Sequence, residues 1–106
     1  MGLSNDVAEA LTRDARLVIL AQLARQRDET LNSPMITRLV DGMGFRRSQD
    51  WIETQLRKLE DLGAVTLSEV DLPGLGQVII ARLTRTGRDH VERRSELAGV
   101  SRPTEG

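Results

Sequence analysis

The sequence predicts a mainly α-helical fold with one β-hairpin, on the strength of three observations. Apolar residues recur three and four positions apart in several segments, as the buried face of a helix requires. Two strand-forming runs, "AVTLSEV" and "QVIIARL", flank the turn "DLPGLG" and together indicate a hairpin. Two helical segments joined by a glycine-containing turn lie directly before that hairpin. This order of helix, turn, helix and hairpin is typical of a winged helix-turn-helix.

The first element is predicted as a long helix over residues 4–27. Its apolar stripe begins at Val7 and Leu11, and apolar neighbours three and four positions apart continue along the segment. The stripe therefore starts well before the part that should pack against the other helices. Residues 29–31 follow as one short strand.

A second helix is predicted over residues 32–44. Asn32 or Ser33 can cap it, because their side-chain oxygens accept hydrogen bonds from the free backbone N–H groups of the first turn. Pro34 fits this turn, where its missing N–H costs nothing. The buried face is expected to contain Met35, Ile36, Leu39, Val40 and Met43.

The third helix is predicted to begin after Ser48, which caps it, and to end at Gly63. Steps of four, three and three residues separate the members of one apolar seam. This seam is expected to face the core and consists of Ile52, Leu56, Leu59 and Leu62.

A last helix is predicted over residues 87–99, with Thr86 as its cap. The whole chain of 106 residues then reads as one winged-helix domain over residues 1–98, with helices at both ends. Residues 99–106 are expected to form a mobile polar tail.

The composition argues against several functional classes. The chain has no cysteine and one histidine, so no metal site is expected. It carries neither a nucleophile motif nor a glycine-rich phosphate loop with lysine, so we expect no enzyme and no cofactor. No apolar run approaches the ~20 residues that cross a bilayer, so we expect a cytoplasmic protein without membrane contact.

Candidate DNA contacts surround the start of the third helix. In a helix-turn-helix, the first residues of the second helix meet base edges in the major groove. Gln49 can pair with adenine, and Arg57 can reach guanine or phosphate. The two arginines of the preceding turn lie where the DNA backbone would pass. The sequence thus predicts a DNA-binding set of Arg46, Arg47, Ser48, Gln49, Thr54, Arg57 and Arg82.

The negative charge of the third helix favours a protein partner over DNA. The third helix has two basic and four acidic residues between Ser48 and Leu62, which gives 2 − 4 = −2. Asp50 and Glu53 lie at the end that would meet DNA. The turn over residues 71–76 contains two leucines and no basic residue. The alternative is therefore a protein-interaction module that reuses the fold.

Three further features each have two interpretations. Trp51 is expected to be a partly buried brace against the second helix or the hairpin, with an anchor in a protein interface as the alternative. His90 is expected at the surface or in an interface. A basic cluster near the C-terminus can flank a nucleic acid or form local ion pairs on a solvated helix, and it contains Arg82, Arg85, Arg88, Arg93 and Arg94.

Several stretches resemble a known group of proteins. "RLVILAQL", "LN", "GFRRSQDWIETQLRKLEDLGAVTL", "LTRTGRDH" and "AGVSRP" are similar to segments of small winged-helix proteins of Mu-like phages and prophages, often labelled ArsR-like. The resemblance implies a winged helix and a DNA-binding regulator or accessory factor of phage origin. Under the alternative, the partner would be a phage protein in assembly or DNA packaging. ArsR metal sensors use thiolates or clustered histidines, which this chain lacks, so metal sensing is not carried over.

The termini predict a homodimer. Apolar residues at both ends lack an evident partner within one chain, and winged-helix proteins often pair terminal helices across a two-fold axis. The interface is expected to use residues 4–15 and 88–98, with Val7, Leu11, Val91 and Leu97 at its centre.

Overall fold

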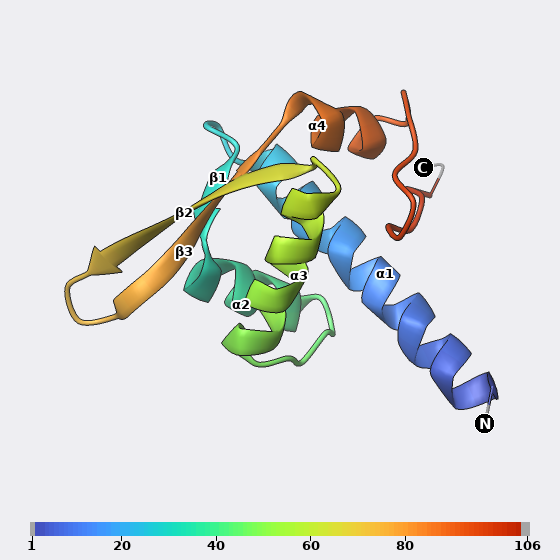
Figure 1. Ribbon diagram of the computed structural model, residues 1–106, viewed down its shortest axis with the longest axis horizontal. Coiled ribbons are helices and arrows are strands. Elements are labelled where there is room, and N and C mark those ends of the chain that lie inside the picture. The colour runs from blue at the N-terminus through green and yellow to red at the C-terminus, as the bar shows by residue number, and fades with distance from the viewer. Residues whose placement is uncertain (1, 105–106) are drawn as a thin grey trace.

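The computed structural model describes residues 2–104, which form four helices and three strands (Figure 1). None of these helices is long and apolar enough to span a membrane. In chain order the elements are α1 (Gly2–Arg25), β1 (Thr30–Asn32), α2 (Ser33–Gly42), α3 (Gln49–Asp61), β2 (Val65–Leu72), β3 (Gly76–Leu83) and α4 (Arg85–Val91).

The three strands form one antiparallel sheet in the order β1-β3-β2. The hairpin pairs Val65 with Leu83 at its base and Leu72 with Gly76 at its tip. The short β1 adds to the other side of β3, where Thr30 pairs with Arg82. The predicted fold class, mainly α-helical with a β-hairpin in a winged helix-turn-helix, is confirmed.

The core lies where α1, α2 and α3 meet one face of the sheet. The seam predicted for α3 is buried at Ile52, Leu56 and Leu59. From the sheet, Ile79, Ala81 and Leu83 alternate along β3 and are also buried, as expected for a strand with one covered face. Further buried residues in this core are Ile19, Leu20 and Leu23 of α1 and Ile36 and Val40 of α2.

The helix caps confirm most of the predicted element starts. Asn32 Oδ1 accepts from the Met35 N–H at 2.8 Å, and Ser48 Oγ accepts from the Trp51 N–H at 3.0 Å. The prediction of Thr86 as the cap of α4 is wrong, because Thr84 Oγ1 accepts from the Gly87 N–H at 3.1 Å.

Helix α4 also ends earlier than predicted, at Val91. Its position depends on a close approach at Gly87, where an added Cβ would lie 2.3 Å from the carbonyl oxygen of Ala64. A larger residue would therefore push α4 away from the start of the hairpin. Val91 and Leu97 are partly buried against the core, so they have the partners that the sequence analysis took to be missing.

The prediction for α2 is wrong at two of its five apolar residues. Ile36 and Val40 are fully buried, but Met35 is 41% exposed and Met43 is 56% exposed. The core reaches only one side of α2, and both methionines lie outside the area that it covers.

Residues 99–104 are packed against the domain, which corrects the prediction of a mobile tail for this part. Val100 is only 6% exposed, and the Ser101 N–H donates to the carbonyl of Arg13 at 3.2 Å. The Ser101 hydroxyl also bonds to the Asp14 carboxylate. The tail therefore lies along α1, beside α4 (Figure 1).

Arg16 and His90 hold this tail from two sides. Arg16 donates to the Gly99 carbonyl at 2.8 Å and to Gln55 Oε1 of α3 at 2.9 Å. Burial, with the nearby charge of Arg13, lowers the pKa of the Arg16 guanidinium. We call this region, made of residues 13–16, His90 and residues 97–104, the C-terminal corner.

His90 is buried, which corrects the prediction of a surface or interface histidine. Its side chain is 1% exposed and lies between two backbone groups. The Leu97 N–H donates to Nδ1 at 3.0 Å, so the ring hydrogen is on Nε2, which bonds to the Ser101 carbonyl at 2.8 Å. The histidine thus joins α4 to the tail.

Candidate nucleic-acid interface

The outer face of α3 is exposed to solvent along its length. Ser48, Asp50, Thr54, Arg57 and Lys58 are all exposed, whereas the opposite face packs in the core. The Ser48 hydroxyl is occupied as the cap, and the Thr54 hydroxyl donates to the Asp50 carbonyl at 3.1 Å. Both side chains remain at the surface, so the whole outer face of α3 is accessible to a partner.

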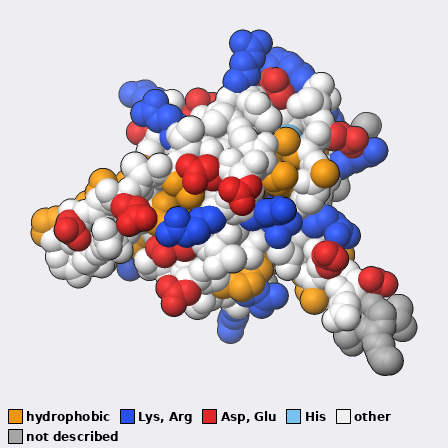
Figure 2. Space-filling model, in the orientation of Figure 1, with side chains coloured by type: hydrophobic (Ala, Val, Ile, Leu, Met, Phe, Trp, Pro, Cys, Tyr) orange, Lys and Arg blue, Asp and Glu red, His pale blue; other side chains and the backbone are white. Residues whose placement is uncertain are grey.

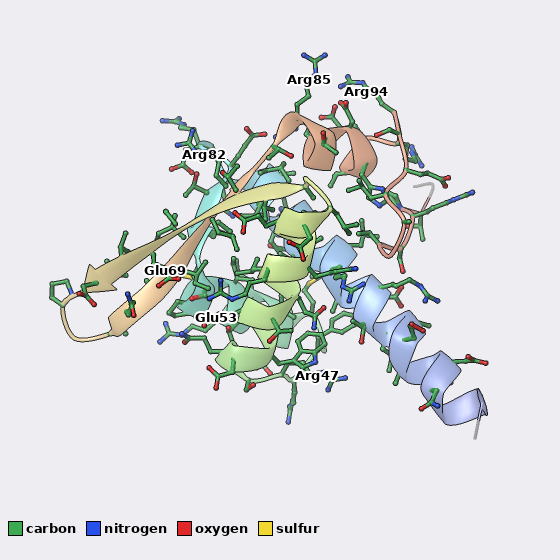
Figure 3. The ribbon with its side chains drawn as sticks, in the orientation of Figure 1. Arg47, Glu53, Glu69, Arg82, Arg85 and Arg94 are labelled. Carbon is green, nitrogen blue, oxygen red and sulfur yellow. The ribbon has the colours of Figure 1, made fainter. Side chains whose placement is uncertain are left out.

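The two arginines of the turn lie beside the start of this helix. Arg46 approaches Asp41 at 4.0 Å, with 89% of its side chain exposed. Arg47 lies over the ring of Trp51, 5.1 Å from its centre, in a cation–π contact. Trp51 itself is partly buried against the core, in the arrangement expected of a brace. Both arginines belong to the turn that leads into the N-terminal end of α3, where Figure 3 shows Arg47.

Glu53 is held by a neighbour that the sequence analysis did not identify. The buried Ser33 hydroxyl at the start of α2 donates to the Glu53 carboxylate at 2.7 Å, and it accepts from the Ile79 N–H at 3.2 Å. Gln49 Nε2 donates to the same carboxylate at 3.1 Å. Glu53 thus joins α2 and α3, while its link to Gln49 occupies an amide that was expected to read a base.

Acidic residues also line the space between α3 and the hairpin. Arg57 lies 3.8 Å from Glu69 of β2, and both side chains are more than half exposed. Glu60 accepts from the Leu67 N–H of β2 at 3.2 Å. These contacts border a hollow of about 270 Å³. Figure 2 shows acidic and basic side chains side by side on this face.

The structure separates Arg82 from the other predicted DNA contacts. Arg82 lies on β3, between Thr30 and Thr66, and is exposed. Figure 3 shows it on the opposite side of the hairpin from Glu53 and Glu69, toward α4, far from Arg47. The remaining six residues of the set come from the turn and from α3, so they form one region.

Two of the five arginines in the basic cluster around α4, Arg88 and Arg94, form ion pairs with carboxylates of the chain. Arg88 bonds to both Glu29 and Glu92, and its hydrogen bonds to Glu92 and then Glu29 raise its pKa. Arg94 pairs with Glu92 at 2.7 Å. These contacts support the interpretation of a solvated helix with local ion pairs.

The tip of the hairpin is apolar. Leu75 is 58% exposed, and Figure 2 shows a hydrophobic side chain at the end of the hairpin with an acidic one beside it. The tip turn, residues 71–76, contains no arginine or lysine. Any contact of this tip with a partner would therefore be made without a positive charge.

The comparisons with known proteins bear on the fold. No protein-family model matches the chain, and no curated protein matches it. Among solved structures, it is similar to Bacillus subtilis PadR, which was crystallised in complex with operator DNA. The TM-score is 0.60 at 22% sequence identity, over 74% of this chain and 45% of PadR. The chain thus spans less than half of the length of that protein.

The geometry and this likeness together define the class of protein. Two helices joined by a glycine turn, a hairpin after the second helix and a third strand beside the hairpin make a winged helix-turn-helix domain.

Proposed function

We propose that the protein binds duplex DNA, as a regulator or accessory factor, through the outer face of α3 and the turn before it. The observation that carries the proposal is the exposed N-terminal half of α3, flanked by Arg46 and Arg47, in a fold similar to that of a protein solved with operator DNA. In this arrangement α3 would enter the major groove and the two arginines would meet phosphates.

The ion pairs on this face do not prevent such contacts. Arg46 with Asp41 and Arg57 with Glu69 are exposed pairs at 4.0 and 3.8 Å. Exposed pairs of this kind contribute about 0–1 kcal/mol, so a phosphate can replace the carboxylate at little cost. The proposed contact set is Arg46, Arg47, Ser48, Gln49, Thr54 and Arg57.

The test is the salt dependence of affinity for a random-sequence duplex, followed by fluorescence anisotropy. Each neutralised phosphate releases counterions and adds about −0.9 to the slope of log affinity against log salt. Three arginines on one face predict a slope of about −3. The double variant Arg46→Ala/Arg47→Ala should reduce it to about −1.

A matched control comes from the α4 end of the molecule. Arg85→Ala/Arg94→Ala also removes two exposed arginines, but at positions that Figure 3 shows far from Arg47. It should leave the slope unchanged. Equal loss in both double variants would mean that binding follows overall charge, and no binding at ~50 mM salt would contradict DNA binding.

A protein-interaction adaptor is the second candidate, and the acidic lining of the hollow between α3 and the hairpin favours it. Glu60 and Glu69 border this hollow, and their carboxylates would repel phosphate. The exposed Leu75 at the tip suits a protein surface. Phage origin, with a partner in assembly or DNA packaging, rests on the sequence resemblance.

We also propose a homodimer formed through the N-terminal half of α1. Val7 is 58% exposed and Leu11 is 43% exposed, on a stretch of helix that extends away from the domain (Figure 1). Val91 and Leu97 are left out of the proposed interface because they pack within the chain. Sedimentation at micromolar concentration should give a dimer, and Val7→Glu/Leu11→Glu should give a monomer.

A further inference from the structure

A surface groove runs between α1 and α2, away from the residues considered so far. It has a volume of about 520 Å³, and none of the residues that line it belongs to α3 or the hairpin. Gln22 of α1 lies in it and is 8% exposed. The others that matter here are Arg25, Arg38, Leu39, Gly42 and Met43. We call it the α1–α2 groove.

One wall of the groove is apolar. Leu39 of α2 and Met43, the C-cap of that helix, line it and are four residues apart, and Met35 lies one turn before Leu39 on the same face, beyond the lining residues. Met35 and Met43 are the two apolar residues of α2 that the core leaves exposed. Methionine adapts its shape to irregular partners and is used at binding surfaces that accept a helix. This stripe can therefore receive apolar side chains from another molecule.

The rim of the groove is basic. Arg25 and Arg38 line it, and no carboxylate is among its lining residues. Neither arginine forms an ion pair with another residue of the described range 2–104. Two uncompensated guanidinium groups beside an apolar stripe complement carboxylates next to apolar residues.

Gly42 keeps the groove open. It lies at the end of α2 without a positive φ, and no atom lies within 4 Å of where its Cβ would be. Alanine would fit this position and favour the helix more, so the fold itself does not require glycine here. The missing side chain leaves room for another chain to approach the backbone of α2.

We propose that the α1–α2 groove binds an acidic amphipathic helix of a partner protein. The apolar face of that helix would lie on Leu39 and Met43, with Met35 available one turn further along the same face of α2, and its carboxylates would pair with Arg25 and Arg38. Because the groove shares no lining residue with α3 or the hairpin, the partner can bind while the outer face of α3 is occupied. This proposal does not depend on DNA binding.

The experiment uses two labelled peptides of ~18 residues with the same leucine stripe. One carries glutamate and the other carries lysine on both sides of the stripe. Fluorescence anisotropy with the full chain should show the acidic peptide binding at least ~tenfold more tightly. The variant Arg25→Glu/Arg38→Glu should reverse this order, and Gly42→Leu should weaken the acidic peptide ~tenfold by filling the groove.

Control variants test whether the changes in peptide affinity come from the groove itself rather than from net charge or loss of folding. Gly42→Ala, which adds one methyl group, should weaken the acidic peptide less than Gly42→Leu does. Arg85→Glu/Arg94→Glu should still bind the acidic peptide more tightly than the lysine peptide, although it makes the same change in net charge. Circular dichroism checks that each variant is folded. In NMR spectra, amides of residues 35–43 should shift while those of residues 49–57 should not.

Several outcomes would overturn the proposal. These are no binding of the acidic peptide at ~1 mM, an unchanged preference in Arg25→Glu/Arg38→Glu, or shifts centred on α3. Shifts centred on Val7 and Leu11 would show that the peptide binds the exposed part of α1 instead of the groove. This result would also overturn the proposal.

Discussion

The C-terminal corner and the outer face of α3 use similar polar side chains in opposite ways. At the corner, Arg16 and His90 bond to backbone carbonyls and are at least partly buried. On the outer face of α3, Arg46 and Arg57 are exposed and have one distant carboxylate each. The difference lies in what happens when a contact is lost.

A buried polar group that loses its partner costs about 1–3 kcal/mol, because water cannot replace that partner. An exposed ion pair contributes about 0–1 kcal/mol, because water solvates both charges once they separate. The corner therefore stabilises the fold, and the outer face of α3 can exchange its contacts for those of a partner. The predictions below test this division, from the largest expected effect to the smallest.

Leu56→Ala should show the largest loss, because Leu56 is fully buried in the core beneath the outer face. We expect the free energy of unfolding to fall by about 2–5 kcal/mol through lost contacts and a cavity. Urea denaturation gives the value. A loss below ~1 kcal/mol would mean that the inner face of α3 is misassigned.

His90→Ala should cost about 2–4 kcal/mol at the corner. The substitution empties a buried site and leaves the Leu97 N–H and the Ser101 carbonyl without their present partner. Denaturation measures the loss, and hydrogen exchange should show faster exchange at the Leu97 amide. A cost as small as that of an exposed residue would remove the distinction between the two regions.

The pair of Arg57 and Glu69 should contribute less than ~1 kcal/mol to stability. A double-mutant cycle with Arg57→Ala and Glu69→Ala measures the coupling. Because both charges are exposed, the coupling should vanish at ~1 M salt. Coupling that persists at this salt concentration would mean that the pair stabilises the fold as the contacts of the C-terminal corner do, and that it is not an exchangeable surface pair.

Thr54→Ala should have the smallest effect, within about 0.5 kcal/mol of the parent. Thr54 is exposed, and its hydroxyl bonds only to the carbonyl of Asp50 one turn earlier. The comparison with Leu56→Ala in the same helix controls for changes in helix content. Equal losses at the two positions would show that the outer face also carries stability.

The sequence predicts the elements whose causes are local. The cap at Ser48 and the seam through Ile52 and Leu56 depend on spacing along one helix, and both are found as expected. The hairpin follows from two strand-forming runs around a turn. These features need only residues that are close in the chain.

The errors arise where distant residues decide the outcome. Residues 99–104 look like a polar tail until Arg16, 83 residues before Gly99, and His90, 11 residues before Ser101, supply hydrogen bonds to them. Met35 and Met43 look buried until the extent of the core is known. Spacing does not reveal these contacts.

The candidate site shows the same limit. Glu53 looked like an acid facing DNA, yet its carboxylate is held by Ser33, 20 residues earlier. Arg82 was assigned to the DNA-binding set on charge alone, and the sheet directs it away from α3. Charge and residue type suggest candidates, but only the packing decides which of them share a surface.

The contact between Glu60 and β2 has a consequence for self-assembly. Strand β2 is an outer edge of the sheet, and the Leu67 N–H that it would offer to another strand is already bonded to the Glu60 carboxylate. Glu69 and Asp71 place further negative charge on the same strand. A second copy adding its own β2 would bring like charges together and find that amide occupied. Growth into cross-β fibres is opposed at this edge.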